Sequence, residues 1–184
     1  MNHAPEPNKI YGLLAEFPGP DELIAAAQRA TDAGYRRKDA YTPFPVHGLS
    51  EALGLPATRV PLLVLLGGIM GATGGYAMMY YASVISYPLN IGGRALNSWP
   101  LFVPITFECM VLCAAGAAVL GMLALNGLPQ PYHPLFNVPD FALHASRDKF
   151  FLCIESTDPQ YDPAQTRSFL EGLGGVVRIS EVPR

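Results

Sequence analysis

Two long stretches without charge constrain what this chain can fold into. Residues 60–85 contain no Asp, Glu, Lys, Arg or His, and residues 101–128 contain a single charged residue, Glu108. Each stretch is longer than the roughly 20 apolar residues that a helix needs to cross the hydrocarbon core of a bilayer. The helices of a soluble hairpin are usually shorter and have one polar face, which neither stretch shows. We therefore predict two transmembrane helices that form a hairpin.

The composition and the short motifs exclude several function classes. Only 15% of the 184 residues are charged, and the formal net charge is −3. Because the chain has no basic tract and no interleaving of basic and aromatic residues, we expect no nucleic acid partner. We find no Ser-His-Asp spacing, no paired carboxylates, no phosphate-binding loop and no CxxC or Cys/His zinc pattern. The sequence therefore predicts no catalytic residue, no cofactor-binding residue and no metal site.

The segments on either side of the apolar stretches have the pattern of a mixed domain of strands and helices. Strands are predicted at residues 9–17, 36–44, 149–157 and 176–183. Helices are predicted at residues 19–35, capped by Asp21, at 49–55, capped by Ser50, and at 162–175, with Pro163 near its first turn. A proline-rich arm after residue 125 is expected to be ordered but not repetitive.

This order of elements predicts an α+β membrane protein. A strand, a helix and a strand precede the two spans, and the same triplet follows them, so the halves can combine into one split ferredoxin-like (βαβ + βαβ) domain. The predicted organisation is residues 1–59 for the first half, 60–128 for the transmembrane hairpin, and 129–184 for the arm and the second half. Separate small lobes are the alternative, although pieces of this size bury little core.

The distribution of basic residues predicts which side of the membrane the domain occupies. Six Lys and Arg residues precede the first span, five follow the second, and Arg94 alone lies between the spans. This bias favours cytoplasmic termini, since basic residues are enriched in cytoplasmic segments. Cys153 in a predicted strand is also typical of a reducing compartment.

Small residues recur within both spans at helical spacing. Gly67, Gly71 and Gly75 repeat every four residues in the first span, and Cys113, Ala117 and Gly121 do so in the second. Lipid provides no hydrophobic force between helices, and small residues instead let two backbones approach closely. We predict that these positions pack helices together, either within the hairpin, or against a partner subunit, or both.

Other residues of the spans have interfacial or buried polar positions. Tyr80, Tyr81 and Trp99 lie near the span ends, where aromatic residues anchor helices at the membrane surface. Glu108 is the one ionisable residue at membrane depth, where a carboxylate is costly unless it is paired or protonated. Two interpretations stay open: Glu108 hydrogen-bonds a neighbouring helix, for example at Thr73, or it takes part in a proton or ion path.

Several segments are similar to one protein family. They are residues 39–54 (DAYTPFPVHGLSEALG), 87–108 (YPLNIGGRALNSWPLFVPITFE), 125–141 (LNGLPQPYHPLFNVPDF) and 150–158 (FFLCIESTD). Together with the two spans they resemble the ActD subunit of alternative complex III, the bacterial membrane quinol oxidoreductase that is unrelated to cytochrome bc1. The resemblance covers nearly the whole chain.

The resemblance implies a small accessory subunit without a cofactor, in a complex of the bacterial inner membrane. Quinol oxidation would belong to a large polytopic subunit, and the haems and iron–sulfur clusters to multihaem and iron–sulfur partners. The implied topology is two spans with both termini cytoplasmic. The residues alone also allow a stand-alone membrane-anchored module that senses a ligand or a metal, although a clustered Cys/His/Met site for it is not found.

Overall fold

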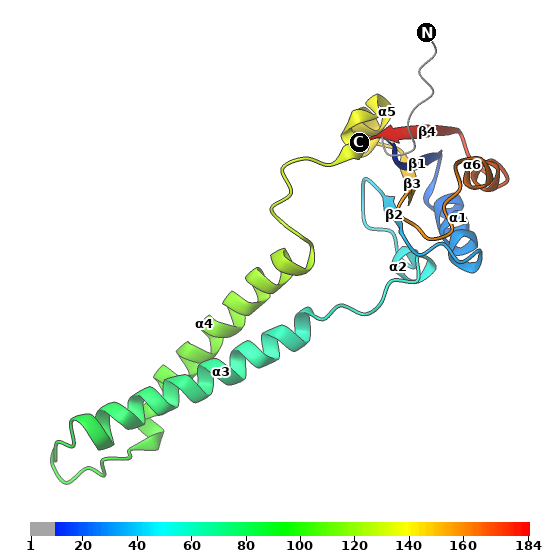
Figure 1. The fold of residues 1–184 in the computed structure, drawn as a ribbon. Coiled ribbons are helices and arrows are strands. Elements are labelled where there is room, and N and C mark those ends of the chain that lie inside the picture. The colour runs from blue at the N-terminus through cyan, green and yellow to red at the C-terminus, as the bar shows by residue number, and fades with distance from the viewer. Residues whose placement is uncertain (1–9) are drawn as a thin grey trace. The chain divides into compact units, whose positions relative to one another are not determined.

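The chain forms two compact units in a computed structural model, which describes residues 10–184. One unit, here called the sheet unit, comprises residues up to Pro56 together with those from Pro131 onward. The other, the hairpin unit, runs from Ala57 to Gln130. The sheet unit is therefore built from two segments that are far apart in the sequence (Figure 1).

A four-stranded antiparallel sheet in the order β2–β3–β1–β4 forms the centre of the sheet unit. Its strands are β1 (Ile10–Phe17), β2 (Lys38–Tyr41), β3 (Phe150–Glu155) and β4 (Arg178–Pro183). Strand β1, which precedes the hairpin in the sequence, lies between β3 and β4, which follow it. The segments before and after the hairpin therefore form one sheet, and the alternative of two separate lobes is wrong.

Alternate side chains of the strands form two apolar clusters, one on each face of the sheet. Leu13, Phe17 and Leu152 belong to the first cluster, which packs against α1 (Pro20–Asp32), α2 (Leu49–Ala52) and α6 (Pro163–Glu171). The second cluster contains Leu14 and Phe151, together with residues of η2 (Pro134–Asn137) and α5 (Pro139–His144). The proline-rich arm thus contains two short helices, and their apolar residues cover the second face.

The helices and strands of the sheet unit are shorter than the sequence predicts, and two caps differ. Helix α1 begins at Pro20, whose fixed φ suits a first helical position, so its N-cap is Gly19 and the predicted cap Asp21 is wrong. Helix α2 follows Gly48, whose φ of 82° is in the left-handed region that glycine tolerates, and the predicted cap Ser50 is also wrong. Strand β2 is only four residues long.

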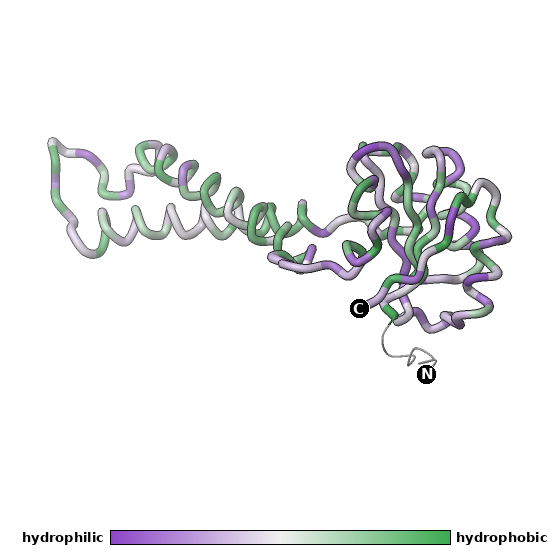
Figure 2. Tube along the Cα trace, turned by 90° about the horizontal axis from the view of Figure 1, so that it is seen from above, coloured by the Kyte–Doolittle hydropathy of each residue, from purple (hydrophilic) through white to green (hydrophobic). Residues whose placement is uncertain are grey.

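The hairpin unit consists of α3 (Val60–Tyr80), the π-helical turn η1 (Tyr81–Ser86) and α4 (Trp99–Leu125). Val60–Ser86 and Trp99–Leu125 are each 27 residues long and apolar enough to cross a membrane. Both helices are coloured mainly green and white in Figure 2, which marks apolar and weakly polar residues along their length. Helix α4 begins at Trp99, two residues before the predicted span, because Pro100 fits the first turn of a helix. It ends at Leu125, three residues before the predicted end, and Gly127 just beyond it takes a φ of 65°.

Candidate helix-docking site

The two long helices contact each other through the glycines of α3. Gly67, Gly71 and Gly75 are the buried residues of this helix. A Cβ atom on Gly71 would lie 2.3 Å from the carbonyl oxygen of Cys109 and 2.8 Å from the Cβ of Cys113. No side chain fits at such distances, so glycine is what allows the two backbones to approach this closely. We call this contact the glycine seam.

The α4 side of the glycine seam consists of small residues spaced four apart. A Cβ atom on Gly67 would lie 2.6 Å from the Cβ of Ala117, and one on Gly75 would lie 2.9 Å from the Cβ of Cys109. Farther along, a Cβ atom on Gly121 would lie 2.8 Å from Cδ1 of Leu63. The five residues proposed for helix packing, Gly67, Gly71, Gly75, Ala117 and Gly121, thus lie at this one contact. Cys109, four residues before Cys113, also belongs to this contact, although the predicted packing residues do not include it.

A second set of small residues lies beside the glycine seam and remains open. Gly68 and Ala72 of α3 and Ala114 and Ala118 of α4 line an apolar groove of about 510 Å³. A Cβ atom on Gly74 or on Gly116 would meet nothing within 4 Å. The hairpin therefore has small residues at its surface as well as at its internal contact.

Glu108 lies on the surface of α4 and is exposed in the isolated chain. Among residues 10–184 it makes no hydrogen bond and no ion pair. Thr73, which the sequence suggested as a partner, instead donates its hydroxyl to the carbonyls of Ile69 and Met70 on its own helix. A neighbour from outside this chain would be needed to satisfy the carboxyl group in a membrane.

The aromatic residues at the span ends are largely exposed. Tyr80 is the last residue of α3, Tyr81 begins η1 and Trp99 begins α4, with exposed fractions of 38%, 59% and 61%. Tyr76 donates a hydrogen bond to Oδ1 of Asn97 at 3.2 Å and packs edge-on against Phe102. The Tyr76 ring thereby links α3 to the residues that lead into α4.

In the sheet unit, the carboxylate of Asp158 joins two loops. It is buried and accepts hydrogen bonds from the backbone N–H groups of Arg36 and Arg37, both at 2.6 Å, and of Gln160 at 2.8 Å. Burial by itself raises the pKa of the Asp158 carboxyl, but these N–H groups and nearby Lys38 outweigh it and hold the pKa below its usual range. Asp158 acts as a structural anchor, because its oxygens are occupied by backbone donors.

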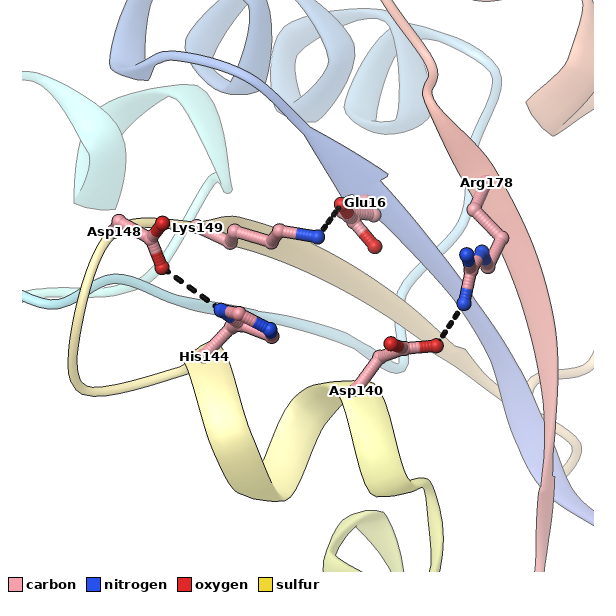
Figure 3. A network of polar contacts seen from close by, with 6 residues as sticks. All are labelled: Glu16, Asp140, His144, Asp148, Lys149 and Arg178. Carbon is pink, nitrogen blue, oxygen red and sulfur yellow. Dashed lines mark hydrogen bonds and ion pairs between the residues drawn. The ribbon is translucent and has the colours of Figure 1, made fainter.

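Polar contacts connect α5 and the start of β3 to the sheet (Figure 3). Buried Glu16 pairs with Nζ of Lys149 at 2.5 Å. Arg178 of β4 pairs with Asp140 of α5, and Nδ1 of His144 lies 3.0 Å from Oδ1 of Asp148. These contacts hold α5 and its neighbours in place and leave no free carboxylate pair for acid–base chemistry among them.

The thiol of Cys153 in the sheet unit is masked by burial. Burial, with a smaller effect of the Glu155 carboxylate, raises the pKa of the Cys153 thiol to about 12, so little nucleophilic thiolate forms at neutral pH. Burial likewise raises the pKa of Tyr11 and Tyr41. Within residues 10–184, no group of three or more His, Cys, Asp or Glu side chains could hold a metal ion.

A comparison with known protein families identifies the family of this chain. The family model described as "Alternative complex III, ActD subunit" matches residues 11–180, a range that takes in both units. No individual curated protein matches the chain. The resemblance predicted from the four quoted segments is therefore confirmed. The chain is a member of the ActD family, and as such a subunit of the electron-transport complex known as alternative complex III.

Proposed function

We propose that this chain is a non-catalytic accessory and assembly subunit, whose hairpin spans the membrane and packs against helices of polytopic partner subunits. The observation that carries the proposal is the groove lined by Gly68, Ala72, Ala114 and Ala118, which stays open after the glycine seam has formed. Small residues on an outward face of a membrane helix favour close contact with a further helix. A hairpin that served only as an anchor would not need this second face.

The sheet unit would be the cytoplasmic, split ferredoxin-like part of the subunit. Two features support this arrangement: the antiparallel order β2–β3–β1–β4, and the joint packing of α1 and α6 into one apolar cluster with the sheet. A hairpin of two spans returns the chain to the side from which it started, and the basic residues favour the cytoplasmic side of the bacterial inner membrane.

The electron carriers and the quinol site would belong to polytopic, iron–sulfur and multihaem subunits. Cys109 lies at the glycine seam, and Cys153 is buried in β3, so neither thiol is placed to hold a cluster. The buried carboxylates of Glu16 and Asp158 are occupied by Lys149 and by backbone N–H groups. These contacts support a role in packing rather than in electron transfer.

Glu108 could contribute to a proton path that partner helices complete. Its outward position on α4 and the lack of a partner for it within residues 10–184 support a contact with a neighbouring subunit. Glu108→Gln keeps the shape of the side chain and removes its titratable proton. In the intact complex, a proton path predicts lower quinol turnover and lower proton release, whereas unchanged values for both would reduce Glu108 to a packing residue.

A pull-down through a C-terminal tag in mild detergent tests the assembly role. We expect recovery of iron–sulfur and multihaem partners in fixed ratio. Replacing Ala114 with Leu would fill the groove without touching the glycine seam, and should lower the yield of partners while the chain itself stays in the membrane. Recovery of the wild-type chain alone would instead favour a stand-alone membrane-anchored sensing module.

A further inference from the structure

A small pocket lies where the first long helix ends and the connecting loop folds back on it. It has a volume of about 270 Å³ and is enclosed by η1 on one side and by loop residues such as Leu89, Ile91 and Leu96 on the other. Three side chains with polar groups line it, Ser83 of η1 and Tyr87 and Arg94 of the loop. The pocket thus combines apolar walls with one positive charge.

Arg94 has no acidic partner on its own unit. Its side chain is exposed, and among the described residues its guanidinium makes neither an ion pair nor a hydrogen bond. Between residues 57 and 130 the only Asp or Glu is Glu108, nine residues into α4, or about 14 Å along the helix axis from its start. An anionic partner of Arg94 would therefore come from outside the unit.

The loop is held in a defined conformation that places Arg94 beside the pocket. Gly92 and Gly93 have φ values of 60° and 76°, which glycine adopts without strain. Oδ1 of Asn90 accepts a hydrogen bond from the N–H of Gly93 at 3.1 Å, and the carbonyl of Ile91 accepts one from the N–H of Arg94 at 3.1 Å. The tight turn positions the cation before any ligand binds.

The position of the pocket along the helix matches the headgroup layer of a bilayer. The 21 residues of α3 span about 31 Å, close to the roughly 30 Å of a hydrocarbon core. With Arg59 just outside one surface, η1 forms the far end of the apolar segment Val60–Ser86, where the core meets the headgroups of the other surface. Tyr81 and Trp99, which flank this level, are of the type found at the interface.

We propose that this pocket binds the phosphate of an anionic glycerophospholipid, with Arg94 as its cationic partner and Ser83 as a hydroxyl donor. The guanidinium can donate two parallel hydrogen bonds to phosphate oxygens. Exposed Leu89 and Ile91 would lie against the upper part of the acyl chains. A partner carboxylate could match the charge but would not need these apolar walls. The proposal rests on the proposed membrane crossing of the hairpin.

The test counts phospholipids retained by the intact complex, by native mass spectrometry with phosphatidylglycerol as the added probe. Arg94→Gln should weaken the binding of one phosphatidylglycerol about fivefold, as expected for one basic residue at a membrane surface. The complex should therefore retain one phosphatidylglycerol fewer. Arg94→Lys should keep most of the binding. Arg147→Gln, which removes a charge that is also exposed but belongs to the sheet unit, should leave the lipid count unchanged.

Ala95→Phe provides a second variant that keeps Arg94 and fills the pocket, in case Arg94→Gln does not assemble. Loss of the same lipid in this variant supports the site. An unchanged lipid count in both variants overturns the lipid site. Loss of a protein subunit while the lipid is retained also overturns it, because that result would indicate that Arg94 pairs with a carboxylate of a partner subunit. Alkaline extraction of membranes tests the crossing itself: a chain that washes off overturns both proposals, whereas a chain that stays with an unchanged count overturns only this one.

Discussion

In the sheet unit large buried side chains fill the space between elements, whereas in the hairpin unit the helices approach each other most closely at glycines. Phe17, Phe151 and Leu152 are at most 1% exposed at the two faces of the sheet. In α3 the buried residues are Gly67, Gly71 and Gly75, and residues such as Leu112, with 74% of its surface exposed, face outward. The apolar residues are thus inside one unit and outside the other.

This difference follows from the surroundings that each unit is built for. In water, burying apolar area stabilises a fold by about 25 cal/mol per Å², so large side chains gather inside. In lipid, apolar side chains gain little by turning inward, and close backbone contact provides the attraction instead. A substitution that enlarges a residue should therefore harm the hairpin most, and one that removes a polar partner should harm the sheet unit most.

The largest effect is expected from Gly71→Leu. Its Cβ would lie 2.3 Å from the backbone oxygen of Cys109, which cannot move aside without separating the helices. We expect a loss of more than about 3 kcal/mol in the stability of the hairpin, the upper range for overpacking. The measurement is the thermal midpoint of the purified chain in detergent, where no partner subunit contacts the hairpin.

Gly74→Leu is the matched control for Gly71→Leu. A Cβ atom there meets nothing within 4 Å, and the position is three residues along the same helix. Its effect on the helix–helix contact should be small. Equal destabilisation by the two variants would mean that the glycine seam does not hold the hairpin together.

The next effect in size is expected from Asp158→Ala in the sheet unit. Removing the carboxylate leaves the backbone N–H groups of Arg36, Arg37 and Gln160 without their acceptor, in loops that water partly reaches. Three hydrogen bonds to a carboxylate, each contributing about 1 kcal/mol because water partly reaches them, predict a loss of about 3 kcal/mol in the free energy of unfolding. Denaturant unfolding of the purified chain in detergent measures it, with Asp32→Ala as the control for an exposed Asp that accepts one hydrogen bond. A loss no larger than that of the control would contradict the anchoring role.

The same carboxylate predicts how stability depends on pH. Because the pKa of Asp158 is lower in the folded than in the unfolded chain, its contribution is complete above the unfolded value of about 3.9. It is lost as pH falls through the lower folded pKa. Unfolding curves between pH 6 and pH 2 should show a smaller acid-dependent loss for Asp158→Asn than for wild type, and parallel curves would argue against this source of pH dependence.

A moderate effect is expected from Lys149→Met. Glu16 would remain as a charged carboxylate with only 6% of its side chain exposed, and unpaired buried charge is costly. Because the Lys149 side chain is 29% exposed and partly solvated, we expect a loss of only about 2 kcal/mol in the free energy of unfolding. The double variant Glu16→Leu with Lys149→Met should recover most of that loss. If the double variant is no more stable than Lys149→Met alone, the cost does not come from the unpaired carboxylate.

The smallest effect is expected from Arg178→Gln, which removes the ion pair with Asp140. More than half of the Arg178 side chain is exposed, and water screens such pairs. The change in the free energy of unfolding should stay below about 0.5 kcal/mol. A loss as large as that of Lys149→Met would show that the pair fixes α5 to the sheet more firmly than its exposure implies.

Much of the fold could be predicted from the sequence because it depends on local patterns. The two long helices follow from apolar length, and the four strands and the helices α1 and α6 from runs of residues a few positions long. The four-residue repeat of Gly67, Gly71 and Gly75 likewise predicted helix packing without any structure. Such features are set by neighbours along the chain, whose spacing is fixed by helix and strand geometry.

The tertiary structure decided how distant parts of the chain meet. The repeat of small residues in the first span leaves their packing partners open, and only the packed helices show that Gly71 is at the seam while Gly68 lines an open groove. The rotation of α4 about its own axis, which brings Cys109 and Cys113 to the seam, also turns Glu108 outward. Asp158 binds Arg36 and Arg37 across more than a hundred residues, a contact that no local pattern encodes. Rotation about a helix axis and pairing of distant loops depend on the whole set of contacts, so sequence spacing leaves them open.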